Sequence, residues 1–438
     1  MRHECIIIAD SPGALVELCG ISILERLLRT LQRSGINRAT VLTNTSKLIS
    51  EALATPSWAR AEIDLRVCRR PDGAVMIEQI IASWPENAES LLIVRGNTIF
   101  DIRLLRLLLE QDTTTVLVDS SPPAEQESLV VSAPNTCAGK LCGVALIQHG
   151  WASGQSGSFE NALSKGLERG TLAILDVAAQ PLYSPALRRN LRPFWFRTPS
   201  PAQEKTAENV LLDSVQKGSP DLPALIHAPI ERFLIRHLCK TPVRPNHFTA
   251  AWALAALITT VLFATGRLMW GIVFALIVGI VDGLDGKQAR LKVETTKGGK
   301  IEHQLDSIFE IAWPTALACH FYISGQLPSA FLYLALLVIA EALDGIGKLG
   351  VYVPAERRLV EPDFFDRIVR LFGGRRNIYI WVLIAAVAWG VPAKALIVMA
   401  YWEVVTATVD LLHASWIRRA IPATPAEPAQ TDSANDLR

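Results

Sequence analysis

Long apolar segments in the second half of the chain constrain its fold more than any other feature. From residue 247 onward, apolar runs alternate with polar connections, and each run is near the ~20 residues that a helix needs to cross a bilayer. We expect six spanning helices, at 247–265, 267–284, 303–324, 327–347, 377–393 and 395–416. The second half is therefore predicted to be an all-α, six-helix transmembrane bundle.

The polar connections of this half predict its orientation. Basic residues gather in the connections 286–301 and 348–376, and again after the last run at Arg418 and Arg419. The positive-inside rule places such connections in the cytoplasm. With an even number of spans, both termini also face the cytoplasm, which in a bacterium means an inner-membrane protein. The seven cysteines contain no Cys-x-x-Cys pair, as expected for reduced thiols in that compartment.

Residues 1–198 alternate strand and helix patterns instead. Apolar strands are expected at 5–9, 39–44, 91–97, 114–120 and 143–148, and the clearest helical periodicity lies at 21–35. Strands that alternate with helices predict a mostly parallel, doubly wound α/β sheet. The N-terminal sequence MRHECIIIAD has no cleavage-site pattern, so we expect a buried first strand rather than a signal peptide.

Shorter segments complete the expected organisation. Residues 199–222 are polar with Pro, Ser and Gly, which is typical of a linker with some helix. Residues 223–240 mix aliphatic side chains with Arg, His and Lys, which favours an amphipathic helix in the headgroup layer over a soluble helix packed on the first domain. The membrane domain then covers 241–420, and the tail 421–438 is expected to be disordered. A net charge of +1 gives no field that would attract nucleic acid.

Five acidic residues stand at the edge of the predicted bundle. Asp282 and Asp285 share a helical face at the end of one apolar run, and Glu302, Asp306 and Glu310 share a face at the start of the next. Acids at a membrane edge are energetically costly and mark functional sites. Oxygen ligands from two facing helices favour Mg²⁺, Mn²⁺ or Ca²⁺ over zinc. Because Mg²⁺ commonly binds few carboxylates together with substrate phosphates, a phosphate substrate is implied.

This stretch resembles the signature of the CDP-alcohol phosphotransferases, or CDP-alcohol phosphatidyltransferases. The first half of the signature, Asp-x-x-Asp-Gly-x-x-Ala-Arg, is matched by Asp282, Asp285, Gly286, Ala289 and Arg290. The flanking RPNHFT at 244–249 resembles the Pro-Asn-x-x-Thr that opens the first membrane helix of that family, and the likeness covers residues 225–417. The resemblance implies a membrane enzyme that releases CMP from a CDP-linked donor.

The second half of the signature, Gly-x-x-x-Asp-x-x-x-Asp, is met with a substitution. Gly298, Glu302 and Asp306 keep its spacing, with Glu in place of the third Asp and a loop one residue shorter. The other register pairs Asp306 with Glu310 and needs a loop three residues longer. We favour the first register, and the two stay open.

The resemblance also implies a role for each signature residue. Asp282, Asp285 and Glu302 would be metal ligands, and Asp306 would be both a ligand and the general base on the acceptor hydroxyl. Glu310 would be an added ligand or a neighbour of the ligands. The diphosphate of the donor would be contacted by Gly286, Ala289 and Arg290.

The first half of the chain resembles sugar-phosphate nucleotidyltransferases, through ELCGISILERLLRTLQRSGINRATVLTN, LLIVRGNTIFD and CGVALI. In that family the first strand enters a Gly-rich basic loop whose backbone N–H groups cradle triphosphate. Here the strand enters DSPGALVELCG, which has no Lys or Arg. Gly96 and Asn97 stand where the family has a metal-binding Asp, and Asp101 is shifted. We predict a degenerate domain that does not bind CTP; an ordinary α/β domain is the alternative.

The leading hypothesis for function is a membrane phosphotransferase of polar-lipid biosynthesis that requires Mg²⁺ or Mn²⁺. Its donor would be CDP-diacylglycerol or a soluble CDP-alcohol, its acceptor a hydroxyl group and its surroundings membrane lipids, with a homodimer left open. A transporter is the competing class, because intramembrane acids also serve ion pathways, but no inverted repeat is visible. An inactive scaffold is a third reading.

Other polar residues of the membrane half are weaker candidates. Arg375 and Arg376 are read either as phosphate contacts or as topology anchors. An acceptor pocket, or pairing with interfacial basic residues, is considered for Glu341, Asp344, Glu403, Asp410 and His413.

Overall fold

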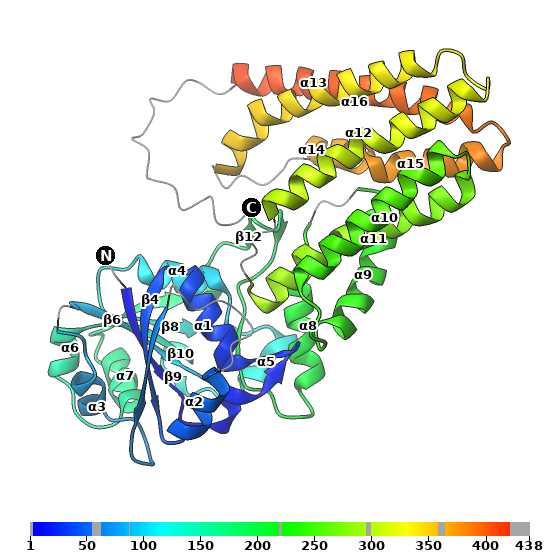
Figure 1. Ribbon diagram of the computed structural model, residues 1–438. Coiled ribbons are helices and arrows are strands. Elements are labelled where there is room, and N and C mark those ends of the chain that lie inside the picture. The colour runs from blue at the N-terminus through cyan, green and yellow to red at the C-terminus, as the bar shows by residue number, and fades with distance from the viewer. Residues whose placement is uncertain are drawn as a thin grey trace. The chain divides into compact units, whose positions relative to one another are not determined.

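The chain divides into two units that differ in architecture. The first comprises Met1–Leu182, Leu191–Ser214 and Leu291–Glu294, and the second comprises Tyr183–Asn190, Val215–Arg290 and Thr295–Arg438. The computed structural model describes residues 3–54, 63–86, 88–218, 221–294, 299–357 and 364–420. The sheet lies in the first unit and the long apolar helices lie in the second (Figure 1).

An eight-stranded sheet forms the centre of the first unit. Its main path runs β11 (Ala173–Asp176), β8 (Thr115–Asp119), β10 (Gly139–Gln148), β6 (Ser90–Arg95), β1 (His3–Ile8), β4 (Ile36–Thr43) and β5 (Asp64–Arg69), and β9 (Asn135–Thr136) pairs with β10. β1 is parallel to β4 and β6, and β4 is parallel to β5. Only β10 runs antiparallel to β6 and β8 on this path. The predicted α/β fold with a mostly parallel sheet is confirmed.

Helices cover both faces of this sheet, which is why the strand Cys5–Ile8 is buried throughout (Figure 1). On one face, α3 (Ile77–Ala82), α6 (His149–Ser153) and α7 (Phe159–Glu168) bury side chains in a cluster with Ile6 and Ile8. On the other face, α1 (Ile23–Arg33) packs against β4, and α4 (Ile102–Leu109) packs against β8 and β10. Gly35, with φ of 86°, turns the chain after α1.

The remaining elements of the first unit are short or peripheral. They are η1 (Pro12–Leu15), β2 (Glu17–Leu18), β3 (Ile21–Ser22), α2 (Ser46–Ala54), β7 (Thr98–Phe100), α5 (Ala124–Val130), η2 (Val177–Ala179), β14 (Trp195–Arg197) and α8 (Glu204–Ser214). The segment predicted as a linker thus contains a helix, α8, and the residues of α8 belong to the first unit together with the sheet.

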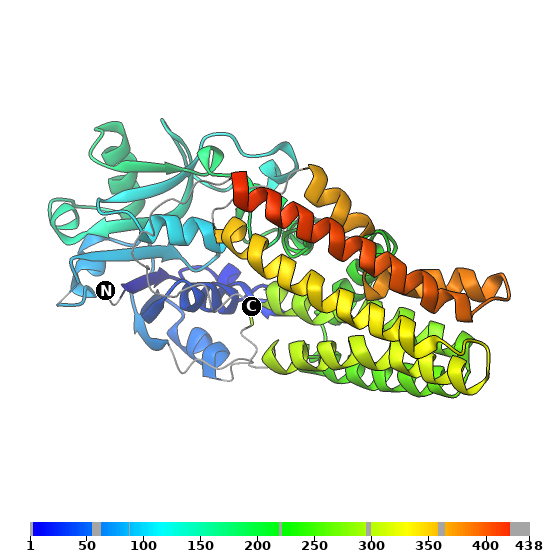
Figure 2. The ribbon, with the colours of Figure 1, turned by 90° about the horizontal axis from the view of Figure 1, so that it is seen from above.

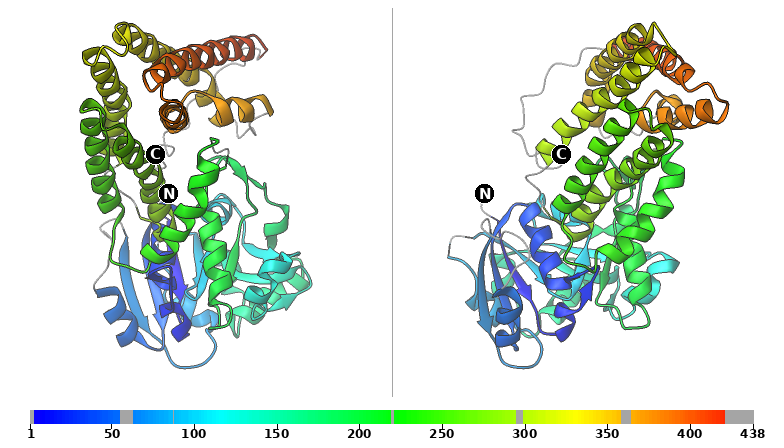
Figure 3. Two further views of the ribbon diagram at one scale, coloured as in Figure 1. Left: turned by 90° about the vertical axis from the view of Figure 1, so that its right-hand side faces the viewer. Right: turned by 45° about the vertical axis from the view of Figure 1, so that its right-hand side comes forward.

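Helices make up nearly all of the described second unit. They are α9 (Ala224–Leu238), α10 (Pro245–Ala264), α11 (Leu268–Lys292), α12 (Gly299–Ile323), α13 (Ala330–Arg357), α14 (Phe364–Phe372), α15 (Arg376–Ala388) and α16 (Ala393–Ala420), with a small hairpin of β12 (Tyr183–Ser184) and β13 (Arg189–Asn190). α13 and α16 lie side by side (Figure 2), as do α10 and α12 (Figure 3). One buried apolar cluster joins α10, α11, α12, α13, α15 and α16.

Three of the described helical segments are long and apolar enough to cross a membrane, namely Pro245–Ala264, Leu268–Lys292 and Ala393–Ser415. Arg376–Ala388 is apolar but shorter. Large apolar side chains are exposed on these helices, among them Leu254, Leu257, Val261, Met269, Trp270 and Val405. A surface of this kind indicates membrane association. The predicted count of six spanning helices is not confirmed.

Helix extends into two stretches that were predicted as polar loops. α11 continues to Lys292 instead of ending near residue 284, so the whole first half of the signature is helical. α13 continues to Arg357, and α14 occupies part of the predicted connection 348–376. Hydropathy locates the apolar stretch, whereas Gln, Ala, Arg, Leu and Lys extend a helix equally well beyond it. The basic loop residue Lys297, Gly298 and the tail 421–438 lie outside the described residues.

Candidate active site

Asp282 of α11 and Asp306 of α12 share one cation, the guanidinium group of Arg376. Its Nη1 donates to Asp306 Oδ1 at 2.5 Å, and its Nη2 donates to Asp282 Oδ2 at 3.1 Å. The arginine side chain is only 10% exposed, whereas those of the two aspartates are 31–36% exposed. Because Arg376 is the first residue of α15, the site joins three helices.

Two aromatic rings hold this guanidinium in place. Its central carbon lies 5.9 Å from the ring centroid of Trp252 on α10 and 5.5 Å from that of Phe309 on α12. The two rings meet edge to face, with centroids 5.8 Å apart, and both residues are buried. Each cation–π contact of this type stabilises by ~0.5–2 kcal/mol. Arg376 is therefore positioned by two kinds of contact, hydrogen bonds to the carboxylates and cation–π contacts with the rings.

Asp285, the second acid of the signature, faces α10. Its Oδ2 accepts a hydrogen bond from Thr249 Oγ1 at 3.3 Å, and the residue is buried. Thr249 closes the Pro-Asn-x-x-Thr stretch, in which Pro245 begins α10. Pro is preorganised for the first position of a helix, so this short motif sets the threonine hydroxyl one turn into the helix. The sequence contains the motif, but it does not indicate the contact with Asp285.

The other residues of the first half-signature lie on the last turns of α11. Arg290 Nε donates to the backbone oxygen of Val215 at 3.1 Å, and Gln288 Nε2 donates to that of Val243 at 3.1 Å. Gly286 and Ala289 are half-buried. A Cβ atom added to Gly286 would lie 3.2 Å from Arg290 Nη1, so the glycine leaves room for the guanidinium group beside the helix.

The acids of the second half-signature lie on α12. Asp306 is joined to Asp282 through Arg376, and Glu310 lies one turn further along the helix and is half-buried. Glu302 belongs to the first turns of α12, and its side chain is outside the described part of the chain. Among the described residues, no three His, Cys, Asp or Glu side chains gather closely enough to hold a metal ion. The choice between Glu302 and Glu310 stays open.

α9 packs on α11 at two glycines. A Cβ atom on Gly279 would come within 2.9 Å of the His227 ring, and one on Gly283 would come within 2.8 Å of the Glu231 carboxylate. Glu231 in turn forms an ion pair with Lys287, one turn further along α11 and inside the signature. Burial lowers the pKa of His227, although the charge of Glu231 acts in the opposite direction. These polar contacts were not predicted.

The outward face of α9 is apolar. Leu225, Ile226, Ile230 and Phe233 are exposed, whereas His227 and Glu231 are buried. This inverts the usual arrangement of a water-soluble amphipathic helix, in which the apolar face is the buried one.

The weaker candidates of the later helices have separate surroundings. Glu403 is buried and accepts a hydrogen bond from the Tyr379 hydroxyl, while the His413 ring lies 4.7 Å from that of Phe365. Asp344 and Asp410 are buried, and Glu341 is half-buried. Arg375 takes the N-cap position of α15, so the structure separates it from Arg376, which meets the acids.

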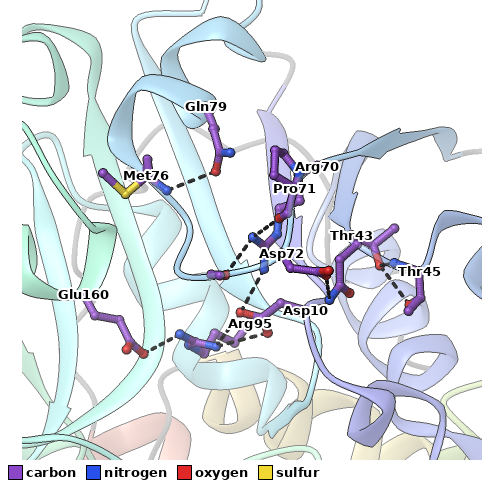
Figure 4. A network of polar contacts seen from close by, with 12 residues as sticks. Asp10, Thr43, Thr45, Arg70, Pro71, Asp72, Met76, Gln79, Arg95 and Glu160 are labelled. Atoms are coloured by element: carbon purple, nitrogen blue, oxygen red, sulfur yellow. Dashed lines mark hydrogen bonds and ion pairs between the residues drawn. The ribbon is translucent and has the colours of Figure 1, made fainter.

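Charged side chains at the carboxyl end of the parallel strands in the first unit pair with one another (Figure 4). Asp10, which follows β1, lies 3.5 Å from Arg70 Nη2 and 3.3 Å from Arg95 Nη1. Arg95 also pairs with Glu160 at 2.5 Å. A cavity of about 380 Å³ is lined by Asn44, Arg69, Arg70, Pro71 and Asp72. The charges of Arg70 and Arg95 are thus already offset within the unit.

The loop after β1 uses its backbone N–H groups in a local turn. Gly13 N donates to Ser11 Oγ at 3.2 Å, and Ala14 N donates to Ser11 O at 3.1 Å. Asp101, near the position of the expected metal-binding Asp, caps α4 by accepting from Arg103 N at 3.0 Å, and it pairs with the Arg103 guanidinium. The N–H groups of Gly13 and Ala14 and the carboxylate of Asp101 thus each have a partner close by in the sequence.

Comparison with known proteins gives different matches for the two halves of the chain. Residues 243–409 match the family model described as CDP-alcohol phosphatidyltransferase. No curated protein matches the chain. The N-terminal half resembles solved nucleotidyltransferases, such as the inositol-1-phosphate CTP transferase from T. maritima, at 13% identity and a TM-score of 0.35 over 48% of this chain and 96% of that one.

Two further structures have similar values. HddC from Yersinia pseudotuberculosis is 12% identical, with a TM-score of 0.34 over 48% of this chain and 99% of that chain. The UDP-glucose pyrophosphorylase from Acinetobacter baumanii is 10% identical, with a TM-score of 0.34 over 48% and 93%. Likeness at this level says nothing about activity. The second unit is a helical unit whose exposed apolar helices indicate membrane association. Within this unit, residues 243–409 are similar to the CDP-alcohol phosphatidyltransferase family, which is the resemblance that the signature predicted.

Proposed function

We propose that this protein is a multi-pass membrane enzyme that transfers a phospho-alcohol or phosphatidyl group from a CDP-linked donor to a hydroxyl acceptor. One observation carries the proposal beyond the family match: Asp282 and Asp306, on different helices, converge on a single positive charge. The acceptor and the alcohol of the donor are left open, with CDP-diacylglycerol and soluble CDP-alcohols as the two donor classes.

The proposed membrane arrangement uses six helices. α10, α11, α12, α13, α15 and α16 would span the bilayer within a domain of residues 241–420, with both termini on the cytoplasmic side. α9 would lie in the interface within 223–240, and its exposed apolar face supports this position. Residues 1–198 would form the degenerate nucleotidyltransferase-like domain, joined to it through 199–222.

The donor set fits Mg²⁺ or Mn²⁺ in its chemistry. Each candidate ligand supplies carboxylate oxygen, which these hard cations prefer, and the two described aspartates already face a common cation. Asp282, Asp285 and Asp306 would hold the metal together with Glu302 or Glu310. When bound, the metal offsets the negative charge of the donor diphosphate.

Asp306 is assigned the proton transfer. The acceptor oxygen forms a bond to the phosphorus that carries the alcohol, while the bond from that phosphorus to the oxygen bridging to cytidylate breaks. CMP leaves with the electron pair of the broken bond, and the hydroxyl proton moves to the Asp306 carboxylate. Gly286, Ala289 and Arg290 would contact the cytidine diphosphate and fix its position on α11.

The test is release of CMP by the purified full-length protein in detergent or lipid, with Mg²⁺ or Mn²⁺. CDP-diacylglycerol and soluble CDP-alcohols are compared as donors, and the lipid product is identified. Asp306→Asn should lower the rate by ~10²-fold or more, because it removes a general base. Asp64→Asn, an exposed aspartate of β5, is the matched control and should keep full activity.

Two results would count against the proposal. One is a lack of CMP release from every CDP donor by a well-folded protein, especially if the protein instead supports cation-dependent uptake into vesicles. The other is full activity in Asp306→Asn. Chelation of the divalent metal should also stop CMP release, and its return should restore the rate.

A further inference from the structure

Arg376 binds the carboxylates of two acids that the proposed reaction assigns to a metal. Each terminal nitrogen of its guanidinium group binds a different carboxylate, one on α11 and one on α12. A guanidinium N–H and a metal ion seek the same lone pairs on carboxylate oxygen. The fork of Arg376 therefore lies between Asp282 and Asp306, where a cation shared by these two residues would also lie.

The charges explain why this arginine is favourable beside the two aspartates. Two ionised carboxylates on neighbouring helices repel each other, and partial burial reduces their stabilisation by solvating water. The single positive charge of Arg376 reduces the net charge of this three-residue group from −2 to −1. A divalent cation would neutralise both aspartates without the arginine, so the two cations are alternatives in charge as well as in position.

Arg376 is also incompletely satisfied in this arrangement. The residue is nine-tenths buried, and its Nε finds no acceptor among the residues that the structure describes. A buried donor without an acceptor is costly. Trp252 and Phe309 contact the guanidinium through their rings, which hold a cation without accepting a directed hydrogen bond at each N–H. The side chain is thus held near the acids, while its Nε–H group makes no hydrogen bond to the described residues.

We propose that Arg376 is an internal counter-ion that competes with the divalent cation for Asp282 and Asp306. Metal binding then requires the guanidinium to leave these two carboxylates. The inference rests on the proposed metal site, and it adds a regulatory property: the metal concentration that the enzyme needs is set in part by its own arginine. In the absence of metal, the arginine keeps the two helices together and the acid pair stable.

The test measures Mn²⁺ binding to the full-length protein by calorimetry, without any CDP-linked donor. Arg376→Gln removes the competing charge and should tighten Mn²⁺ binding by about tenfold or more. Arg376→Lys keeps the charge but loses the fork, so its affinity should lie between those of the wild type and Arg376→Gln. The adjacent Arg375→Gln is the matched control, because it removes the same charge at the N-cap position of α15, one residue before Arg376, and it should bind Mn²⁺ like the wild type.

A second measurement covers loss of stability in the variants. Without metal, Arg376→Gln should melt at a lower temperature than the wild type, and Mn²⁺ should raise its melting temperature by more than it raises that of the wild type. The double variant Asp282→Asn, Asp306→Asn should lose the Mn²⁺ response. Persistence of the response in that double variant would place the binding elsewhere and overturn the inference.

The inference and the proposed function fail in different ways. Equal or weaker Mn²⁺ binding by Arg376→Gln would overturn the competition while leaving CMP release by the wild type intact. Absence of CMP release, with Mn²⁺ binding that tightens in Arg376→Gln, would overturn the proposed reaction and leave the counter-ion in place.

Discussion

Thr249 of α10 donates a hydrogen bond from its hydroxyl group to one signature acid, Asp285. Its hydrogen bond to Asp285 is the contact that the structure gives this buried carboxylate from α10. Thr249→Val keeps the shape of the side chain and removes the donor. Because partners that orient metal ligands commonly contribute a factor of ~10–100 to affinity or activity, we expect CMP release to fall by that order and the Mn²⁺ requirement to rise.

Thr260→Val provides the comparison on the same helix. The Thr260 hydroxyl donates to the backbone oxygen of Ala256 at 3.0 Å, as many helical threonines do, so its loss should leave CMP release unchanged. Equal rates for the two valine variants would show that the Thr249 hydroxyl does not orient Asp285. Steady-state rates over a series of Mn²⁺ concentrations make the measurement.

The sequence could predict the relative positions of residues that lie close together along the chain. The spacing of Asp282 and Asp285 places both on one helical face, since a helix fixes the geometry of neighbours three apart. Arg376 is different, because its contact with the acids depends on where α15 begins relative to α11 and α12. Adjacent arginines are equivalent in a sequence, and only tertiary structure separates Arg375 from Arg376.

At the scale of elements, the contact of α9 with α11 depends on the absence of side chains at Gly279 and Gly283. Gly283→Ala would place a methyl group 2.8 Å from the Glu231 carboxylate, next to its ion pair with Lys287. Overpacking of this kind costs ~1–3 kcal/mol. We expect a lower melting temperature in detergent, together with slower CMP release, because Lys287 lies within the signature helix.

A glycine in open surroundings gives the control for this prediction. Gly345 lies within α13 and has no atom within 4 Å of where its Cβ would be. Alanine is the better helix former by ~1 kcal/mol, so Gly345→Ala should keep or raise the melting temperature. Equal changes in Gly283→Ala and Gly345→Ala would mean that α9 does not rest on α11 in solution.

The hydrophobic pattern of 223–240 predicted an amphipathic helix, and α9 is one. The pattern could not say which face meets protein. In water the apolar face of a helix turns toward the core, whereas at a bilayer it turns toward lipid and leaves the polar face for protein contacts. His227 and Glu231 were therefore assigned no role from the sequence, although they make the buried contacts.

At the scale of the whole molecule, the chain combines an α/β unit built on a mostly parallel sheet with a helical unit that matches the CDP-alcohol phosphatidyltransferase family model over residues 243–409. The alternation of strands and helices predicted the first fold well, because a buried parallel sheet needs continuous apolar strands. The number of spanning helices was harder to predict, because polar and charged residues enter the later helices. Length and composition alone support three spans among the described residues.

The two units are expected to differ in activity as well. In the first unit, the loop after β1 uses its N–H groups in a turn, and Asp10 offsets Arg70 and Arg95. A triphosphate would have to compete with these internal contacts, and the loop sequence DSPGALVELCG contains no basic residue to favour it. We therefore predict that the full-length protein forms no CDP-alcohol from CTP, even where it consumes one.

Pyrophosphate release separates this reaction from the proposed one, which releases CMP. The full-length protein is incubated with CTP, Mg²⁺ and the phosphates of glycerol, choline and inositol in turn, and pyrophosphate should stay at the level of a protein-free sample.

Asp10→Asn serves as the companion variant, because it weakens the pairing of Arg70 and Arg95. Pyrophosphate release by the wild type that disappears in Asp10→Asn would mean that Asp10 serves an active nucleotidyl site. In that case the chain would make its own donor. If the protein releases CMP from a CDP-linked donor but no pyrophosphate from CTP, the donor must come from a separate cytidylyl-transfer reaction. That reaction would use CTP and an alcohol phosphate or a phosphatidic acid.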